Sequence, residues 1–222
     1  MKELQLPVSR RVFVGRSSFG AAALLVMASS GSMTLTGCSA QQVFTDIEKW
    51  VPAGEQDVNA IVAILAANGF PLGAAAQATV SLIEAALNQL LADVKIYLSV
   101  SPPPVGALQK IQAALEVIAS NYQQFLQTIS IPTSPLLSTI VALAELTVST
   151  ITGFLSQLPP TTGVSAAFLI VRVGNMQSTV APKIRPLRVF KKDHNHILDA
   201  GMKAGLKVPD NAYLHLSLVE RF

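Results

Sequence analysis

The 222-residue sequence contains a single cysteine, Cys38, so no disulfide bond can form within the chain. It is also poor in charge, because Asp, Glu, Lys and Arg make up only 13 % of its residues. Soluble domains typically have about twice that share. Half of the residues are hydrophobic, which is enough for a substantial core and excludes the composition of a disordered chain.

The sequence lacks the short motifs of common catalytic and nucleotide sites. It has no Gly-x-Gly-x-x-Gly, no Gly-x-x-x-x-Gly-Lys-Ser/Thr, no His-Glu-x-x-His and no Gly-x-Ser-x-Gly. Glu84, Glu116 and Glu145 fall on the polar faces of separate predicted helices, so no carboxylate pair for acid–base catalysis can be assigned. These absences favour a protein that is not an enzyme and has no cofactor.

Residues 1–37 have the order of an export signal. A polar opening segment contains adjacent arginines, Arg10 and Arg11, and a charge-free, moderately apolar run follows from Ser17 to Leu35. The length of the run is close to that of the shortest membrane-spanning helices. Its serine and glycine content and its position instead favour a signal that is removed after export.

Two motifs in this region resemble those of bacterial exported lipoproteins. Ser9, Arg10, Arg11 and Phe13 match the twin-arginine pattern Ser/Thr-Arg-Arg-x-Phe-Leu-Lys, although Val and Gly replace its last two residues. This resemblance implies export of an already folded protein. Leu35-Thr36-Gly37-Cys38 resembles a lipobox. It implies that Cys38 receives a diacylglyceryl group and becomes the mature N-terminus.

Lipidation of Cys38 would attach the protein to a membrane without a spanning helix. A lone cysteine is more often a small buried hydrophobic residue. The position of Cys38 directly after the apolar run favours the lipid site. Two acyl chains anchor stably, at about 0.8 kcal/mol per buried methylene. Ser39 stands where aspartate would retain a Gram-negative lipoprotein at the inner membrane, so the resemblance implies the outer membrane in such a bacterium.

Charge divides the remaining chain into two parts. Residues 38–171 contain three basic and eight acidic residues, whereas residues 172–222 contain nine basic and four acidic residues. The sign changes near Pro159-Pro160, a strong breaker of regular structure. We therefore predict a signal peptide over 1–37, a helical bundle over 38–158 and a basic C-terminal tail over 159–222, packed on or beside the bundle.

Apolar residues recur at spacings of three and four through the bundle region, which predicts helices separated by proline-rich corners. The fold class predicted is all-α, an antiparallel up-and-down four-helix bundle preceded by a signal helix and followed by a mostly helical tail. In the first segment, Trp50 either caps the bundle core, which we favour, or lies among lipid headgroups beside the anchor. The predicted helices cover residues 43–51, 55–68, 74–100, 108–129 and 136–158.

The last of these helices has the hydropathy of a membrane span, because Glu145 is its only charge. A polar stripe opposite its apolar stripe favours a helix of a soluble bundle instead. That stripe comprises Ser138, Glu145, Ser149, Thr152 and Ser156, and the predicted outer face of the preceding helix comprises Gln109, Gln112, Glu116, Gln123 and Gln127.

The tail is less regular. Residues 165–173 form a short apolar run that suits a strand or a helix, and the helical context favours a helix. A helix is predicted over 186–200, with Gly201 as its stop. Residues 211–222 fit both a strand and a helix.

Two groups of tail residues are candidate binding sites. The first is the basic cluster Lys183, Arg185, Arg188, Lys191 and Lys192. Export makes nucleic acid improbable as its partner, which leaves anionic lipid headgroups, an anionic wall polymer or, as we favour, the acidic face of the bundle itself. The second is the group of metal-ligand types Asp193, His194, His196, Asp199 and His215.

A metal site in this second group is disfavoured by helix geometry, because His194 and His196 would point about 200° apart.

The leading hypothesis for function is an exported, lipid-anchored envelope protein with a non-catalytic structural or partner-binding role. The first alternative is a metal-binding envelope enzyme that uses His194, His196 and Asp199. The second is a membrane-active protein that opens its bundle and inserts residues 136–158.

Overall fold

The computed structural model describes residues 40–129, 131, 134–159, 169–173, 176–180, 183 and 185–215, all within one compact unit. The predicted export residues Arg10, Arg11 and Phe13 and the predicted lipid site Cys38 lie outside these residues. The elements are α1 (Ala40–Ala67), α2 (Ala74–Ser99), α3 (Ala107–Thr128), α4 (Pro135–Gln157), β1 (Leu169–Val173), β2 (Met176–Val180), α5 (Leu187–Lys203) and the short 3-10 helix η1 (Asp210–Ala212).

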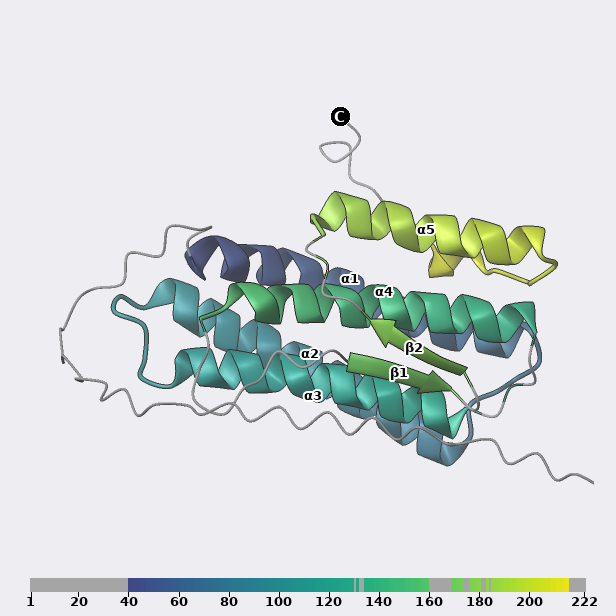
Figure 1. Cartoon of the computed structure of the whole chain (residues 1–222), viewed down its shortest axis with the longest axis horizontal. Helices are drawn as coiled ribbons and strands as arrows, with labels where there is room; N and C mark the ends of the chain where they lie inside the picture. The colour runs from purple at the N-terminus through teal and green to yellow at the C-terminus, as the bar shows by residue number, and fades with distance from the viewer. Residues whose placement is uncertain are drawn as a thin grey trace, which may run out of the picture. The chain divides into compact units, whose positions relative to one another are not determined.

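Helices α1 to α4 form an antiparallel up-and-down bundle, as predicted (Figure 1). Each helix packs beside the next, and α4 returns to pack beside α1, which closes the bundle. The predicted apolar stripes form its core. On α2, the side chains of Ile83, Leu87, Leu90 and Val94 are completely buried. Spacings of three and four place such residues on one helical face, and burial of that face stabilises the bundle.

The first helix differs from the prediction, because residues 43–51 and 55–68 belong to one continuous helix, α1, with Pro52 inside it. Proline inside a helix removes one backbone donor, and its ring crowds the carbonyl four residues earlier. The packing of α1 against α2, α4 and α5 stabilises the continuous helix against this cost. Trp50 is 1 % exposed. Trp50 is therefore a core residue, and its placement among lipid headgroups is excluded.

The corners of the bundle use residues that the sequence analysis identified as helix breakers and caps. Gly69 follows α1 with φ +83°, and the amides of Gly69 and Phe70 bond back to the carbonyls of Ala66 and Leu65. This is a Schellman motif, which glycine favours because it needs a left-handed residue. The Ser134 hydroxyl accepts a hydrogen bond from an amide in the first turn of α4.

A β-hairpin covers one side of the bundle. Strands β1 and β2 pair antiparallel, with Leu169 opposite Val180, and both lie against α4 while β1 also lies against α3. The helix predicted over 165–173 is therefore wrong for residues 169–173. A short apolar run such as residues 165–173 cannot distinguish a strand from a helix by periodicity, and for residues 169–173 pairing with β2 decides the conformation.

Three polar side chains that we predicted on outer helical faces are buried. Gln112 of α3 donates a hydrogen bond to the Pro159 carbonyl at 2.9 Å. Ser149 and Thr152 of α4 are 6 % and 1 % exposed. The prediction considered each helix as part of an isolated bundle, whereas the chain that follows α4 returns over these faces. Thus the amide of Lys183 donates to the Ser149 carbonyl at 3.2 Å.

Among the described residues, α4 is the one helix long and apolar enough to cross a membrane. Of its most apolar 18-residue window, 83 % is buried inside the protein. Helices α1, α3 and α5 pack against α4 and supply apolar contacts that a lipid bilayer would otherwise have to provide.

Helix α5 packs on the bundle against α4 and α1 (Figure 1). It extends three residues beyond the predicted end, and Gly201 lies inside it. A Cβ atom at Gly201 would lie 2.9 Å from the Thr139 hydroxyl, so glycine is needed here for the close approach of α5 to α4. The residue that ends α5 in the left-handed conformation is Gly205, with φ +92°.

Candidate functional site: a buried carboxylate between helices

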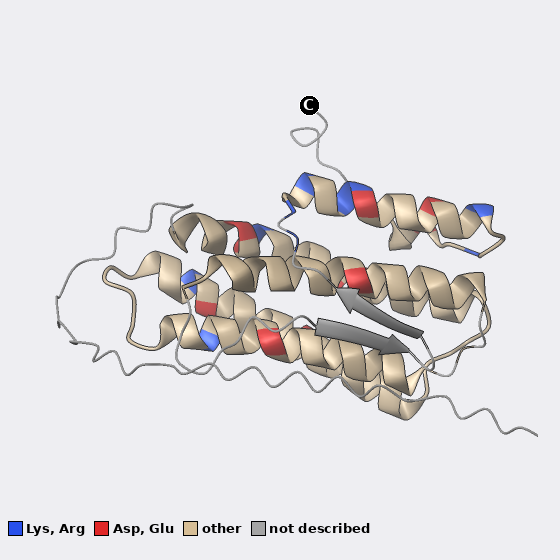
Figure 2. Cartoon of the chain, in the orientation of Figure 1, with Lys and Arg blue, Asp and Glu red and all other residues tan. Residues whose placement is uncertain are grey.

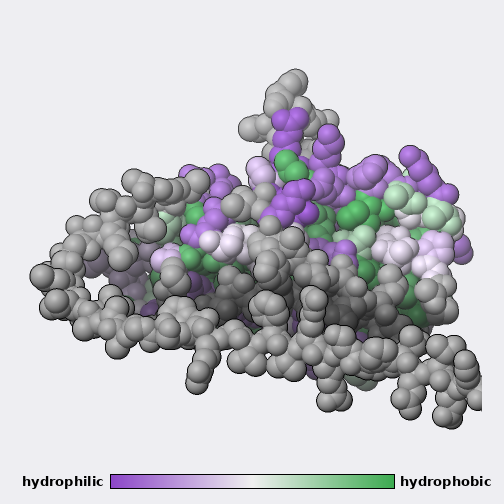
Figure 3. Space-filling view, in the orientation of Figure 1, coloured by the Kyte–Doolittle hydropathy of each residue, from purple (hydrophilic) through white to green (hydrophobic). Residues whose placement is uncertain are grey.

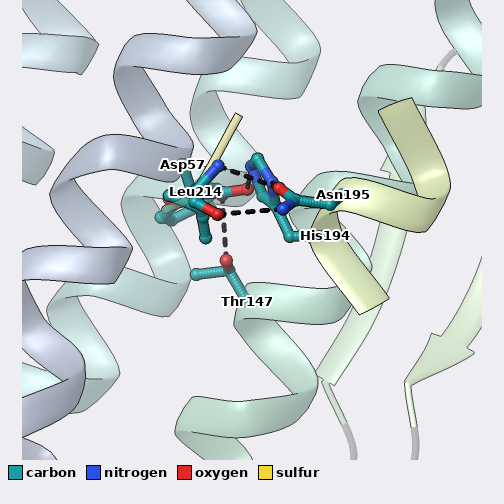
Figure 4. Close-up of polar contacts among 6 residues, drawn as sticks. Asp57, Thr147, His194, Asn195 and Leu214 are labelled. Carbon is teal, nitrogen blue, oxygen red and sulfur yellow. Dashed lines mark hydrogen bonds and ion pairs between the residues drawn. The ribbon is translucent and has the colours of Figure 1, made fainter. Parts of the chain in front are cut away.

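The most unusual side chain in the described structure is Asp57, an acidic residue with no exposed surface in the middle of α1. Burying an ionised carboxylate costs several kcal/mol unless hydrogen bonds and an opposite charge offset the loss of water. The groups around Asp57 come from three other helices, and Figure 4 shows two of them, Thr147 and His194, beside its carboxylate.

One carboxylate oxygen of Asp57 accepts two hydroxyl hydrogen bonds. The Tyr122 hydroxyl from α3 donates to Oδ2 at 3.0 Å, and the Thr147 hydroxyl from α4 donates to the same atom at 2.9 Å. Both donors are fully buried. Two hydroxyl donors on one oxygen replace hydrogen bonds that the buried carboxylate would otherwise make with water.

The other carboxylate oxygen faces a histidine of the tail. His194 of α5 is fully buried, and its Nε2 lies 3.2 Å from Oδ1 of Asp57. The two atoms are within ion-pair distance but are not aligned for a hydrogen bond. Asp57 therefore connects α1, α3, α4 and α5 through a single side chain.

An aromatic cluster lies in the same interhelical region. Trp50 of α1 makes edge-to-face contacts with Phe154 of α4 at 5.7 Å and with Phe190 of α5 at 5.9 Å between ring centroids. Phe190 in turn lies 6.4 Å from the His194 ring. Such pairs add roughly 0.5–1.5 kcal/mol each beyond their buried area. A Cβ atom at Gly54 would lie 3.0 Å from the Trp50 ring, so glycine leaves room for that ring.

Two asparagines attach the end of the tail to helices. Asn195 of α5 donates to the Leu214 carbonyl and accepts from the Leu214 amide, at 2.9 and 2.8 Å. Asn68, just after α1, makes the same pair of bonds with the backbone of Lys207, at 2.9 and 3.1 Å. The tail up to Leu214 is therefore an integral part of the fold.

The structure separates the candidate metal ligands. His194 points into the core toward Asp57, whereas His196 is exposed and lines a pocket of about 250 Å³ between α4 and α5. Asp199 accepts a hydrogen bond from the Tyr213 hydroxyl at 3.0 Å, and Asp193 pairs with Arg185 at 3.3 Å. Within the described part of the chain, no three His, Cys, Asp or Glu residues are placed to hold a metal ion.

The basic cluster lies at the start of α5 and just before it. Arg185 pairs with Asp193 of α5, and its Nη1 donates to the Ser149 hydroxyl at 2.7 Å. Lys191 donates to the His215 carbonyl at 3.2 Å. Lys183, Arg188 and Lys192 are exposed. Figure 2 shows Lys and Arg concentrated in this region, and Figure 3 shows a hydrophilic surface over α5.

Comparison of the chain with protein-family models, with curated proteins and with solved structures finds no match in any of the three. What the Asp57 centre does must therefore be argued from its geometry. Asp57, Tyr122, Thr147 and His194 have no exposed surface, so a substrate cannot reach them in this conformation. The arrangement is suited to fixing the positions of four helices.

Asp57 was not among the candidate site residues predicted from the sequence, although its spacing in α1 carried a signal. Trp50, Gly54, Asp57, Ile61 and Ile64 follow one another at spacings of four and three and are all buried. An acidic residue in an otherwise apolar stripe predicts a buried, partnered charge. His194 carried the same signal, since it lies four residues from both Phe190 and Leu198 on a predicted helix.

Replacement of Tyr122 by phenylalanine is expected to change how stability depends on alkaline pH. Burial, and then the adjacent Asp57 carboxylate, raise the pKa of Tyr122 well above 10. The unfolded chain therefore loses this proton first. As pH rises above about 10, the tyrosine destabilises the folded state by up to about 1.4 kcal/mol per pH unit.

At pH 7, Tyr122→Phe should lower the unfolding free energy by about 1.5–3 kcal/mol, because a hydrogen bond to a charged group is lost. Above pH 10 the difference from the wild type should shrink. Thr147→Val is the matched control, since it removes the other hydroxyl on Oδ2 without removing a titrating group. Denaturant unfolding from pH 7 to 11 measures both. Equal pH slopes for wild type and Tyr122→Phe would contradict the expectation.

Proposed function

We propose that this protein is an exported lipoprotein of the bacterial cell envelope whose helical bundle has a structural or partner-binding role without catalysis. The observation that carries the proposal is the arrangement of the chain around Cys38. An export-type segment ends there, and the first described helix of a folded domain begins at Ala40. Acylation of Cys38 would thus place the folded domain directly on the membrane.

The interior of the described fold supports a non-catalytic role. Its buried ionisable centre consists of Asp57 with partners that fully enclose it. The candidate metal ligands His194, His196 and Asp199 point to different surroundings. A catalytic site needs several reactive groups that a substrate can reach together. The Asp57 centre is closed, and the exposed His196 is separated from the other two candidate ligands, so neither arrangement favours catalysis.

The connectivity of the bundle supports export in the folded state. Its helices are joined by short corners and pack beside their neighbours in sequence. Such locally connected helical bundles fold fast. Rapid folding would let the domain form before a twin-arginine signal containing Arg10 and Arg11 directs it to a translocase, and no cofactor is needed to explain that route.

The basic cluster is the surface that we propose for an anionic envelope partner. Lys183, Arg188 and Lys192 are exposed, while the carboxylates of Asp193 and Asp199 on the same helix are engaged by Arg185 and Tyr213. Residues 183–203 contain six basic and two acidic side chains, so this region has a net positive charge. Long-range attraction to an anionic surface would follow from this charge distribution.

Replacement of Cys38 by serine tests the proposed anchor. Since Cys38 is the only cysteine, this change removes the only thiol that can be acylated. We expect the protein to leave the membrane fraction, because the free energy of burying two acyl chains is lost. Ser39→Ala is the matched control and should remain membrane-bound. Fractionation and immunoblotting measure the distribution, and an unchanged membrane-bound fraction for Cys38→Ser would contradict the proposal.

A further inference from the structure

The exposed hydrophobic side chains of the bundle are unevenly distributed. Among the described residues, seven large hydrophobic side chains are exposed. Val100 and Val105 lie in the corner between α2 and α3, and Ile96 lies in the last turn of α2 just before it. Val105 is completely exposed, and Val100 is 45 % exposed. The residues between them, Ser101 to Pro104, are also exposed. We call residues 100–105 the apolar corner.

The apolar corner lies at the same end of the bundle as the start of α1 (Figure 1). Gln41 lines one pocket together with Val100, Ser101 and Pro103, and the Phe44 ring contacts the Tyr97 ring at 4.1 Å between centroids. The proposed lipid site, Cys38, precedes Ala40 by two residues. The corner is therefore beside the point where the anchor would enter the membrane.

The tether is too short to hold this end away from a bilayer. Two residues span at most about 7 Å. A headgroup layer is about 5–8 Å thick, which is half the difference between the full bilayer and its hydrocarbon core. An acylated Cys38 would therefore keep the start of α1 at headgroup depth.

Charge around the corner suits contact with lipid. Residues 96–109 contain no charged side chain, and Lys95 and Lys110 are the first charges on either side. Both lysines are exposed. Figure 2 shows the corner free of charge, with Lys or Arg positions on both helices behind it. Lysines flanking an apolar segment can extend their ammonium groups to the headgroups.

We propose that the apolar corner is a second membrane contact, with Val100 and Val105 inserted among the lipids beside the anchor at Cys38. The inference rests on the proposed lipidation of Cys38 and adds an orientation to it. The end of the bundle that contains the apolar corner faces the bilayer. The opposite end, with the corner that follows α1, faces away.

Site-directed spin labelling of the full-length protein, expressed in its exported form and reconstituted into phospholipid vesicles, tests this orientation. Acylation blocks Cys38, so a cysteine introduced by Val105→Cys is the only reactive thiol. Val117→Cys, at a 49 % exposed position on α3, is the matched control. Collision with oxygen reports contact with lipid, and collision with a water-soluble nickel chelate reports contact with water.

We expect the label at position 105 to collide several-fold more with oxygen and several-fold less with the nickel chelate than the label at position 117. Equal nickel collision at both positions would overturn the inference. Protection of position 105 from both reagents would overturn it too, in favour of a protein partner. The mass of the N-terminal peptide separates the two proposals. If Cys38 is not acylated, both the lipid anchor and the membrane contact are wrong. If Cys38 is acylated but the label at position 105 is in water, only the membrane contact is wrong.

A second pair of variants does not depend on labelling. Val100→Asp with Val105→Asp places two charges in the apolar corner, whereas Leu82→Asp with Val117→Asp places two charges at half-exposed positions along α2 and α3. We expect the first pair to speed transfer of the lipidated protein between vesicles by about tenfold. The second pair should leave the rate unchanged. Equal rates for the two pairs would contradict the membrane contact.

Discussion

Replacement of Asp57 by alanine is expected to lower the free energy of unfolding by about 3–5 kcal/mol, a large part of the 5–15 kcal/mol typical of a domain. The loss has two sources. The hydroxyls of Tyr122 and Thr147 lose their acceptor in a site without water access, and His194 loses the carboxylate that faces its Nε2. Chemical denaturation at pH 7, followed by circular dichroism, measures the change.

Asp46→Ala is the matched control, because Asp46 is an exposed carboxylate on the same helix and bonds only its neighbour Gln42 in the described contacts. It should change stability by no more than about 0.5 kcal/mol. A double-mutant cycle with His194→Ala should show a coupling of about 0.5–3 kcal/mol. An Asp57→Ala protein as stable as Asp46→Ala would show that the buried centre does not hold the helices together.

Replacement of both Arg10 and Arg11 by lysine is expected to abolish nearly all export. The change keeps both positive charges and removes only the planar guanidinium groups. A twin-arginine translocase that recognises these groups should fail to accept the precursor, which would accumulate in the cytoplasm. Immunoblots of fractionated cells, read for the uncleaved and cleaved forms, measure the effect.

Arg16→Lys is the control for this export test, since it alters another arginine of the same segment outside the matched pattern. Export of the paired lysine variant at the wild-type level would show that the chain uses a different route. The stability prediction for Asp57→Ala also has a consequence for export. If only folded chains are exported, a variant that populates unfolded states should also reach the envelope in smaller amounts.

Much of the helical architecture could be predicted from the sequence because the apolar spacing is regular. Ile111, Leu115, Ile118 and Tyr122 on α3 are all completely buried, as their spacing indicated. Local rules also identified the Ser134 cap and the Gly69 stop, because both depend on residues adjacent in sequence.

Contacts between segments distant in sequence could not be predicted from such local patterns. The chain after α4 returns over the bundle, where Gln112 bonds the Pro159 carbonyl and Ser149 bonds Lys183 and Arg185. Both side chains are therefore buried, although an isolated bundle would leave them in water. The continuity of α1 through Pro52 depends on packing with three other helices. Similarly, the role of Asp57 depends on hydroxyls from α3 and α4 and on an imidazole from α5, all distant from it in sequence.

The charge asymmetry in the sequence has a clear structural counterpart. Helices α1 to α4 contain the acidic excess, and α5 with its flanking residues contains the basic excess (Figure 2). Arg185 nevertheless pairs with Asp193 of α5, and contacts the bundle through the neutral Ser149 hydroxyl. This pair is not one between the tail and the acidic face of the bundle.

Mass spectrometry of the N-terminal peptide of the mature protein, purified from envelope membranes, tests the proposed function most directly. We expect the peptide to begin at Cys38 and to carry the added mass of a diacylglyceryl group on the thiol. A mature protein that begins elsewhere, or one that begins at an unmodified Cys38, would contradict the lipid anchor and the membrane orientation that rests on it.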